Sequence, residues 1–207
     1  MVYRFDPDWN GEIISQSRVE SAPSYLGMYF PASDIPPQAR RLYTTNLVRI
    51  VADIGATPIP IQPTLNPATG RPLDLSYSAL RSLSPIHMEY LRNIGVQASM
   101  VMSLLQNGRL WGLIVCHHQS PKRISMAMRD NAILISRIAS EKLTAMEATE
   151  HHALVNRATH FNSELIKSFN HGSVKNVLQE LLPEMQALVD ATGVQYQFAY
   201  SFLASRR

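Results

Sequence analysis

Seven histidines and one cysteine are the side chains of this 207-residue chain whose chemistry operates near neutral pH. His87 is the most informative of them, because it follows Ser84-Pro85, a pair typical of a helix start. The positive end of such a helix disfavours imidazolium and should lower the pKa of His87. We therefore expect a neutral imidazole that donates from one ring nitrogen and accepts on the other. A capped histidine in the core is the alternative interpretation.

A second group of reactive side chains, Cys116, His117 and His118, ends a predicted strand. Neighbouring residues of a strand face opposite ways, so the two histidines do not share one pocket, which argues against a two-histidine metal site. Cys116 ends the apolar run Leu110–Cys116, and we expect it to be packed rather than nucleophilic. A Cys-His hydrolase is the weaker alternative, and it requires Cys116 to be exposed and rapidly alkylated.

The remaining histidine pair and the known catalytic motifs offer less. His151 and His152 diverge by about 100 degrees on a helix, so a solvated face or a helix–helix contact is favoured over a ligand site. A single cysteine excludes an internal disulfide framework and a cysteine-rich zinc site. The sequence contains no phosphate loop, no H-E-x-x-H motif and no G-x-S-x-G motif.

Arginine dominates the positive charge, with 15 arginines against 4 lysines and a formal net charge of +3. The arginines are scattered, so no block is dense enough for a nucleic-acid interface. Isolated arginines suit bidentate capture of carboxylates or phosphates, although a GC-rich genome also favours them. Together, Arg49 and Arg81 with Tyr43, Ser84 and Ser99 could bind two anionic arms of one ligand, but their spacing alone does not show this.

The composition predicts a folded protein that does not span a membrane. Apolar residues make up 45% of the chain and charged residues 17%, which is enough for a core and excludes a disordered chain. The apolar run Leu110–Cys116 has seven residues, far short of the roughly 20 that cross a bilayer. No charged leader precedes an apolar stretch, so no secretory signal is expected. One cysteine fits a reducing compartment, and we expect a cytoplasmic protein.

Turn residues and periodicity predict an antiparallel sheet flanked by helices. The strongest signal is Asn107-Gly108, which predicts a hairpin between strands Val96–Gln106 and Arg109–His118. The chain opens inside a strand, Val2–Phe5, so we expect the N-terminus of the parent protein to lie upstream. Adjacent strands with helices at the edges favour an α+β fold. The other predicted elements are a strand over Glu12–Glu20, a loop over 21–36, a helix from Pro36-Pro37 to Thr45, a strand over Leu47–Val51, a polar loop over 63–75 and short helices over Ser76–Leu83 and Ser84–Gly95.

A long helix is predicted over Ser125–Phe169, where apolar or small residues recur with the spacing of one buried stripe. A helix of this length usually connects domains or forms a dimer interface, so we expect a homodimer. Gly172 ends the helix, and Ser173–Ala191 predicts one or two helices interrupted at Pro183. An alternating pattern from Val194 to Tyr200 then starts a strand, as in a second α/β domain cut off at its first strand.

Four segments of the chain form a recognisable set. They are Val2-Tyr3-Arg4-Phe5; Pro31-Ala32-Ser33-Asp34-Ile35-Pro36 with Gln38-Ala39-Arg40 and Leu42-Tyr43; Ser84-Pro85-Ile86-His87 with Tyr90-Leu91-Arg92-Asn93-Ile94-Gly95-Val96; and Leu110-Trp111-Gly112-Leu113-Ile114 with Cys116-His117-His118. In this order and spacing they resemble the bilin-binding GAF domain of phytochromes, most closely that of bacteriophytochromes. The resemblance implies a GAF domain over 1–124, a connecting and dimerisation helix over 125–170, and the start of the adjoining phytochrome-specific (PHY) domain over 171–207.

The resemblance also implies a function and a set of pocket residues. The family holds a linear tetrapyrrole whose 15,16 double bond isomerises on absorbing red or far-red light, and a full-length parent would pass the signal to a histidine kinase and response regulator. Asp34 would lie by the pyrrole nitrogens with its side chain near the D ring, His87 by the pyrrole water network and a propionate, and His117 at the D-ring carbonyl. The other implied residues are Arg49 and Arg81 at the propionates, with Tyr43, Ser84 and Ser99 nearby; Tyr3, Phe30 and Tyr90 around the D ring; and Ile35 and Pro36 beside Asp34.

Two attachment points for the pigment are missing from this pattern. Plant and many cyanobacterial phytochromes attach the bilin through a cysteine immediately before the pocket histidine, and that position is Ile86 here. Bacteriophytochromes use a cysteine upstream of their PAS domain, a region absent from this sequence, as is any histidine kinase. We therefore expect a sensory, non-enzymatic module that binds a bilin, biliverdin above all, without a covalent bond. The alternative is a chromophore-free GAF fragment that acts as a dimerisation or interaction module.

Overall fold

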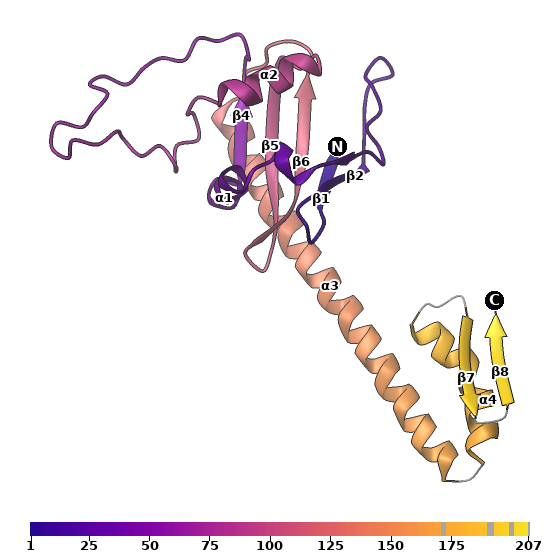
Figure 1. Cartoon of the computed structure of the whole chain (residues 1–207). Coiled ribbons are helices and arrows are strands. Elements are labelled where there is room, and N and C mark those ends of the chain that lie inside the picture. The colour runs from indigo at the N-terminus through magenta and orange to yellow at the C-terminus, as the bar shows by residue number, and fades with distance from the viewer. Residues whose placement is uncertain (171–172, 190–192, 199–200, 207) are drawn as a thin grey trace. The chain divides into compact units, whose positions relative to one another are not determined.

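The computed structural model describes residues 1–170, 173–189, 193–198 and 201–206. The chain divides into two compact units, Met1–Thr144 and Ala145–Arg207. One long helix, α3 (Met126–Phe169), runs through the division, as Figure 1 shows. Its bounds agree closely with the predicted helix over Ser125–Phe169.

The first unit is built on a six-stranded antiparallel sheet with the strand order β3-β2-β1-β6-β5-β4. Its two longest strands, β5 and β6, are joined by Asn107 and Gly108, whose φ angles are 49° and 76°. Two consecutive positive φ values are what a tight hairpin turn needs, and Asn-Gly supplies them at little cost. The predicted hairpin is therefore confirmed. The strands are β1 (Val2–Phe5), β2 (Gly11–Ser15), β3 (Tyr29–Phe30), β4 (Val48–Val51), β5 (Ala98–Gln106) and β6 (Arg109–His118).

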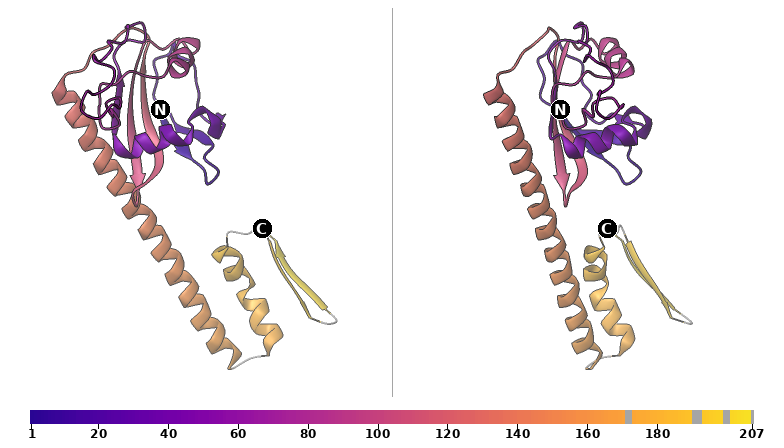
Figure 2. Two further views of the ribbon diagram at one scale, coloured as in Figure 1. Left: turned by 60° about the vertical axis from the view of Figure 1, so that its left-hand side comes forward. Right: turned by 90° about the vertical axis from the view of Figure 1, so that its left-hand side faces the viewer.

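Helices cover both faces of this sheet. The right-hand view of Figure 2 shows α3 on one face, with α1 (Pro37–Thr45) and α2 (Pro85–Asn93) on the other. The backbone N–H of His87 donates to Ser84 Oγ at 3.2 Å, so Ser84 caps α2 as predicted. A short 3-10 turn, η1 (Ala32–Asp34), leads into α1. The α+β fold expected from the sequence is thus confirmed.

The core lies on both sides of the central strands, because neighbouring residues of a strand face opposite ways. On the α1 face, Tyr43 of α1 packs with Val101 and Leu113 of the hairpin. On the α3 face, Met102 packs with Ala132. Consecutive residues Val101 and Met102 therefore serve the two separate clusters.

Polar bonds also join α3 to the sheet. The pairing of β5 with β6 shifts register between Leu104 and Leu105, which is a β-bulge. Ser136 Oγ of α3 donates to the Ser103 carbonyl, and Ser140 Oγ accepts from the Leu105 N–H at 2.9 Å. Ser136 has no exposed surface. The helix thus bonds the backbone groups that flank the bulge, so they are not left unsatisfied.

The second unit contains α4 (Val174–Leu188) and the antiparallel pair β7 (Gly193–Phe198) and β8 (Ser201–Arg206). Pro183 lies inside one continuous α4, so the prediction of a single helix is the correct one of the two. The second strand, β8, was not predicted, and Gly172 and Tyr200 lie outside the described residues. Among the described residues, no helix has both the length and the apolar content to cross a membrane.

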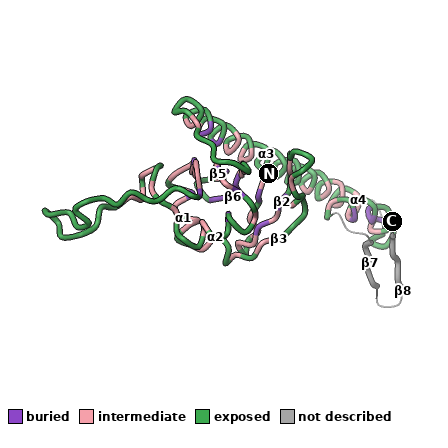
Figure 3. Tube along the Cα trace, turned by 90° about the horizontal axis from the view of Figure 1, so that it is seen from above, coloured by how far each residue is buried: buried purple, intermediate pink, exposed green. Residues whose placement is uncertain are grey.

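Two predictions between β4 and α2 and around β2 are wrong. Ser76–Leu83 is not helical; it belongs to the long connection over 52–84, which is largely exposed in Figure 3. Tyr77 and Leu80 are 82% and 70% exposed, so a helix here would have no apolar face to bury. The return strand ends at Ser15 rather than Glu20, and the predicted loop over 21–36 contains β3.

Candidate functional site

Four of the predicted site residues lie close together on the face of the sheet that α1 and α2 cover. The ring centroids of His87 and Tyr90, both on α2, are 6.0 Å apart in a stacked arrangement. His117 of β6 lies near enough to His87 for the two ring charges to repel each other. Ser99 is the direct partner of His117 across β5 and β6, which places both on the same face, and it is buried.

Both histidines are held in the neutral state. Burial lowers the pKa of His87, and the positive charge of Arg49 lowers it further. Burial also lowers the pKa of His117, to about 4, with added repulsion from the N-terminal ammonium and from His87. The ammonium is close because the Met1 nitrogen donates to the Val115 carbonyl at 2.9 Å. The predicted lowering of the His87 pKa is confirmed, with burial as its largest cause and the charge of Arg49 as the next.

Two arginines continue the site from His87: Arg49 is close to His87, and Arg81 is close to Arg49. The exposed Asp74 carboxylate is near enough to Arg81 for their charges to attract, but the two form no ion pair. Arg49 of β4 and Arg81 of the following loop line one hollow with Asn46, Ser78 and Leu83. Burial lowers the pKa of Arg49, and the like charge of Arg81 lowers it further. Within the described residues neither guanidinium forms an ion pair, and Arg81 Nη2 is buried without a hydrogen-bond partner. Two adjacent, partly buried cations favour an anionic ligand.

The Arg49 guanidinium also lies over the ring of Tyr43, 5.4 Å from its centroid. Tyr43 is buried in the cluster beneath α1, and its burial raises the pKa of its hydroxyl. The aromatic ring therefore holds the cation from one side by a cation–π contact. This leaves the guanidinium edge, with its five N–H donors, to face other groups.

The aromatic residues and Asp34 form the other end of the site. Tyr3 and Phe30 have ring centroids 6.0 Å apart. Burial first, and then the Asp34 carboxylate, raise the pKa of Tyr3 to about 12. Burial and Asp34, in that order, also raise the pKa of Tyr90. Asp34 is therefore close to both tyrosines, while Ile35 packs against the Tyr3 cluster and Pro36 is the N-cap residue of α1.

Cys116 corrects one prediction and weakens one hypothesis. The thiol is exposed rather than packed, because Cys116 lies near the end of β6 on the face opposite His117. Exposure meets one requirement of the Cys-His hydrolase. However, His117 faces away from Cys116, and among the described residues no hydrogen bond reaches the thiol. The structure thus provides no base for a cysteine nucleophile.

His118, His151 and His152 lie outside this group of residues. His118 is exposed, and its Nδ1 accepts from the Ser120 N–H at 3.1 Å, away from His117. His151 and His152 are exposed on α3, with ring centroids 6.4 Å apart. In the part of the chain that the structure describes, no three histidine, cysteine or acidic side chains are grouped to hold a metal ion.

Sequence reasoning missed several residues that border the site. Tyr25 lies close enough to Tyr90 to raise its pKa, although it comes from a segment predicted only as loop. Arg40 and Asn10 hold the turn that carries Asp34. Arg40 was part of a recognised segment without a role, and Asn10 was visible only as a turn residue. No sequence pattern marks either residue for this role, because both side chains bond backbone atoms of other residues.

Comparison with known proteins identifies the class. Residues 1–140 match the GAF domain family model, and the chain belongs to this family. It is 45% identical over 196 residues to a bacteriophytochrome of Xanthomonas campestris pv. campestris (strain 8004), covering 94% of this chain and 31% of the relative. It is 51% identical over 147 residues to a bacteriophytochrome of Pseudomonas aeruginosa, covering 71% of this chain and 20% of the relative.

Solved structures give the same result. A bacteriophytochrome crystal structure from R. palustris superimposes with a TM-score of 0.84 at 38% identity, covering all of this chain and 42% of that one. The crystal structure of a bacteriophytochrome chromophore-binding domain from R. palustris gives a TM-score of 0.69 at 44% identity, covering 72% of this chain and 50% of that one. The resemblance read from four sequence segments is confirmed. The chain spans less than a third of the length of the two curated relatives.

Proposed function

We propose that this chain is the pigment-binding module of a red/far-red photoreceptor and that it holds a linear tetrapyrrole of the biliverdin type. The observation that carries the proposal is the pair Arg49 and Arg81. They lie side by side, neither forms an ion pair in the described part of the chain, and Arg81 Nη2 is buried without a hydrogen-bond acceptor. A flexible pigment with two carboxylate arms supplies the missing acceptors, and the names of the similar proteins support that ligand class.

The donor set fits such a pigment at each end. Arg49 and Arg81, with the Ser99 and Ser84 hydroxyls on the neighbouring elements, would bind the propionate groups. Ser84 contributes less, because its Oγ already accepts from the His87 N–H. Tyr3, Phe30 and Tyr90 provide an aromatic wall for the ring at the opposite end, near Asp34.

The neutral histidines suit a ligand that has both donors and acceptors. Neutral His87 can donate to a carbonyl or carboxylate from one nitrogen and accept from a pyrrole N–H or water on the other. Neutral His117 can donate to a carbonyl oxygen without placing a positive charge beside His87. When bound, the pigment supplies light absorption and isomerisation about one double bond. Arg49 and Arg81 would hold the acidic arms by charged pairs, whereas Tyr3, Phe30 and Tyr90 would contact the other end only through their rings and hydroxyls.

Binding in this chain would be noncovalent. Ile86 precedes the pocket histidine and cannot form a thioether, and its side chain is 80% exposed. Cys116, the one cysteine of the sequence, faces away from His117. Affinity therefore rests on burial of the pigment and on the arginine pairs, and we expect it to depend on salt concentration.

Titration of the purified protein with biliverdin tests the proposal. A far-red absorbance band that red light changes is the expected result. Arg81→Met removes one charge-assisted pair of about 1.5–3 kcal/mol and should weaken binding by about 10- to 150-fold. Arg71→Met is the matched control, since Arg71 is an exposed arginine of the same connection. Colourless protein in excess biliverdin, or equal binding by both variants, would contradict the proposal.

A dimerisation role is the second candidate, and the surface of α3 favours it. Leu134, Ile135 and Ile138 are apolar and more than half exposed within the first unit. We propose that a second copy of the chain covers them. Light scattering of the wild type and of Ile138→Glu, each with and without biliverdin, separates the roles. If Ile138→Glu dissociates the dimer but still binds biliverdin, the result supports both pigment binding and dimerisation through α3. A dimer that forms only without biliverdin would favour the interaction module.

The chain spans part of its relatives, so signalling by the parent protein is a separate proposal. We propose a sensory rather than catalytic role for this module, in a cytoplasmic protein with a downstream histidine kinase and response regulator. Light-dependent phosphotransfer in the parent protein, measured with and without biliverdin, tests that step.

A further inference from the structure

The turn that carries Asp34 is held by a side chain from the helix that follows it. Arg40 of α1 donates from Nη1 to the Ala32 carbonyl at 3.2 Å and to the Ile35 carbonyl at 2.8 Å. These two carbonyls lie on either side of Asp34. One guanidinium therefore clamps both ends of η1, and the Asp34 N–H closes the turn on the Pro31 carbonyl at 3.0 Å.

The β1–β2 turn holds the same segment from the other side. Asn10 Oδ1 accepts from the Ala32 N–H at 3.2 Å, and Asp6 fixes Asn10 by accepting from its backbone N–H at 2.8 Å and from its Nδ2 at 3.0 Å. Trp9 places its ring under the Arg40 guanidinium, 4.6 Å from the carbon at its centre. The planar cation is thus stacked on one face and bonded at one edge.

The backbone of Trp9 adopts an unfavourable conformation in this arrangement. Trp9 has a φ of 68°, a left-handed conformation that a bulky side chain rarely adopts. Such outliers persist where surrounding contacts over-determine them, and they concentrate near functional sites. Here the strained residue supplies the ring beneath Arg40, so the strain serves the clamp on the Asp34 turn.

The clamp leaves the Asp34 carboxylate unused. Arg40 forms no ion pair in the described part of the chain, and its hydrogen bonds go to backbone carbonyls. Asp34 is exposed and lies near Tyr3 and Tyr90. The position of Asp34 is therefore set through its backbone, while its side chain remains available to a ligand.

We propose that Arg40 is a positioning residue for Asp34: its guanidinium, stacked on Trp9, fixes the η1 turn so that the Asp34 carboxylate faces the bound ligand. The significance for pigment binding rests on the function proposed above. Lysine replaces arginine poorly here, because its tetrahedral ammonium has no planar face to stack on Trp9 while it donates to the two carbonyls. The methylene stem of a lysine would still pack similarly, which makes Arg40→Lys the mild variant.

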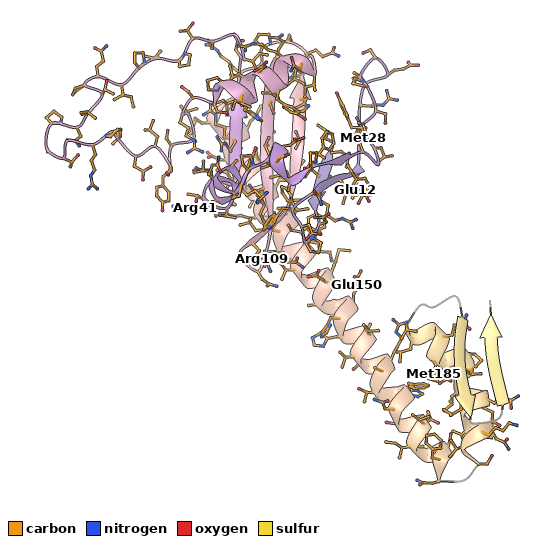
Figure 4. The ribbon with its side chains drawn as sticks, viewed as in Figure 1. Glu12, Met28, Arg41, Arg109, Glu150 and Met185 are labelled. Carbon is orange, nitrogen blue, oxygen red and sulfur yellow. The ribbon has the colours of Figure 1, made fainter. Side chains whose placement is uncertain are left out.

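The first test uses the protein without pigment. Hydrogen exchange of the Asp34 N–H should accelerate about tenfold or more in both Arg40→Lys and Arg40→Met, because a charge-assisted clamp is lost. Arg41→Lys and Arg41→Met are the matched controls: Arg41 is the adjacent, exposed arginine on α1, labelled in Figure 4. Far-UV circular dichroism checks that the variants fold. Unchanged exchange at Asp34 in Arg40→Lys would overturn the proposal, whether or not any pigment binds.

The second test uses the protein with biliverdin. The pH dependence of the far-red band should change in the same direction in Arg40→Lys and in Asp34→Asn, and the double variant should change no more than Asp34→Asn alone. A purely structural role for Arg40 would lower the amount of pigment bound without altering this pH dependence. Additive changes in the double variant would overturn the proposal. Wild-type protein that takes up no pigment refutes the proposed function instead, and the exchange result then decides the clamp by itself.

Discussion

Protonation of His117 should destabilise the first unit in mild acid. The pKa of His117 is about 4 in the folded chain against an ordinary value of 6.5, so the unfolded chain binds a proton first as the pH falls. Stability from this group is therefore complete above pH 6.5 and is lost as the pH falls toward 4. The two pKa values correspond to a loss of about 3.4 kcal/mol in the free energy of unfolding over that whole window. Between pH 7 and pH 5 the loss is about 2 kcal/mol.

That figure is an upper bound, because the ring of His117 is only partly buried. Solvent screening reduces the expected loss between pH 7 and pH 5 to about 1–2 kcal/mol. Urea unfolding at pH 5, 6 and 7 measures it directly. Trp9 and Trp111 are the two tryptophans of the sequence, and both lie in the first unit, so their fluorescence follows that unit alone.

His117→Gln isolates the contribution of this side chain. The variant should lose about 1–2 kcal/mol less stability than the wild type between pH 7 and pH 5, with the remaining slope due in part to His87, whose pKa is also lowered. His118→Gln is the matched control, because His118 is exposed on the opposite face of the same strand. Equal pH slopes for the wild type and His117→Gln would refute the assignment of the low pKa to burial at this position.

Three further substitutions test the packing that supports the site, each by urea unfolding at pH 7 with tryptophan fluorescence. Gly112→Ala should cost about 3 kcal/mol of stability, since the new Cβ would lie 2.4 Å from the Tyr3 carbonyl of the neighbouring strand. Gly55→Ala is the control: its Cβ would meet only a flexible carboxylate at 3.2 Å, so stability should change by less than about 0.5 kcal/mol. Gly11→Ala should cost about 1–3 kcal/mol, because its Cβ would overlap the Tyr3 ring at 1.7 Å and push that ring out of the aromatic wall; unchanged biliverdin affinity in this variant would argue against a role for Tyr3. Ser136→Ala should cost about 1–3 kcal/mol by leaving the bulge carbonyl unbonded, and a neutral result would show that water replaces the serine.

Local signals in the sequence were sufficient for the elements that border the site. Asn107-Gly108 and Ser84-Pro85 each carry their own conformational preference, and both act as predicted. By contrast, β3 has two residues, and it exists because Tyr29 and Phe30 pair with Glu12 and Gly11. A strand that short has no periodicity of its own, so only the tertiary pairing defines it.

Side-chain environments were harder to predict than elements. The apolar run that ends at Cys116 suggested a packed thiol, but burial depends on where α3 stops covering β6, which no local pattern records. Ser76–Leu83 had helix-forming residues without a surface to bury them against. The proximity of Arg49 to Arg81 joins residues from a strand and a loop, and only the folded chain shows that, among the described residues, neither forms an ion pair.

The two serines on α3 restrict how this helix can respond to events on the far side of the sheet. Apolar contacts tolerate gradual sliding. The hydrogen bonds of Ser136 and Ser140 to β5, by contrast, require one rotation of the helix about its axis and one position along that axis. A one-residue advance would turn both hydroxyls away by about 100 degrees and strand two main-chain groups without partners. We therefore expect α3 to move in discrete steps rather than continuously. The helix either keeps both hydrogen bonds to the backbone beside the bulge or loses both.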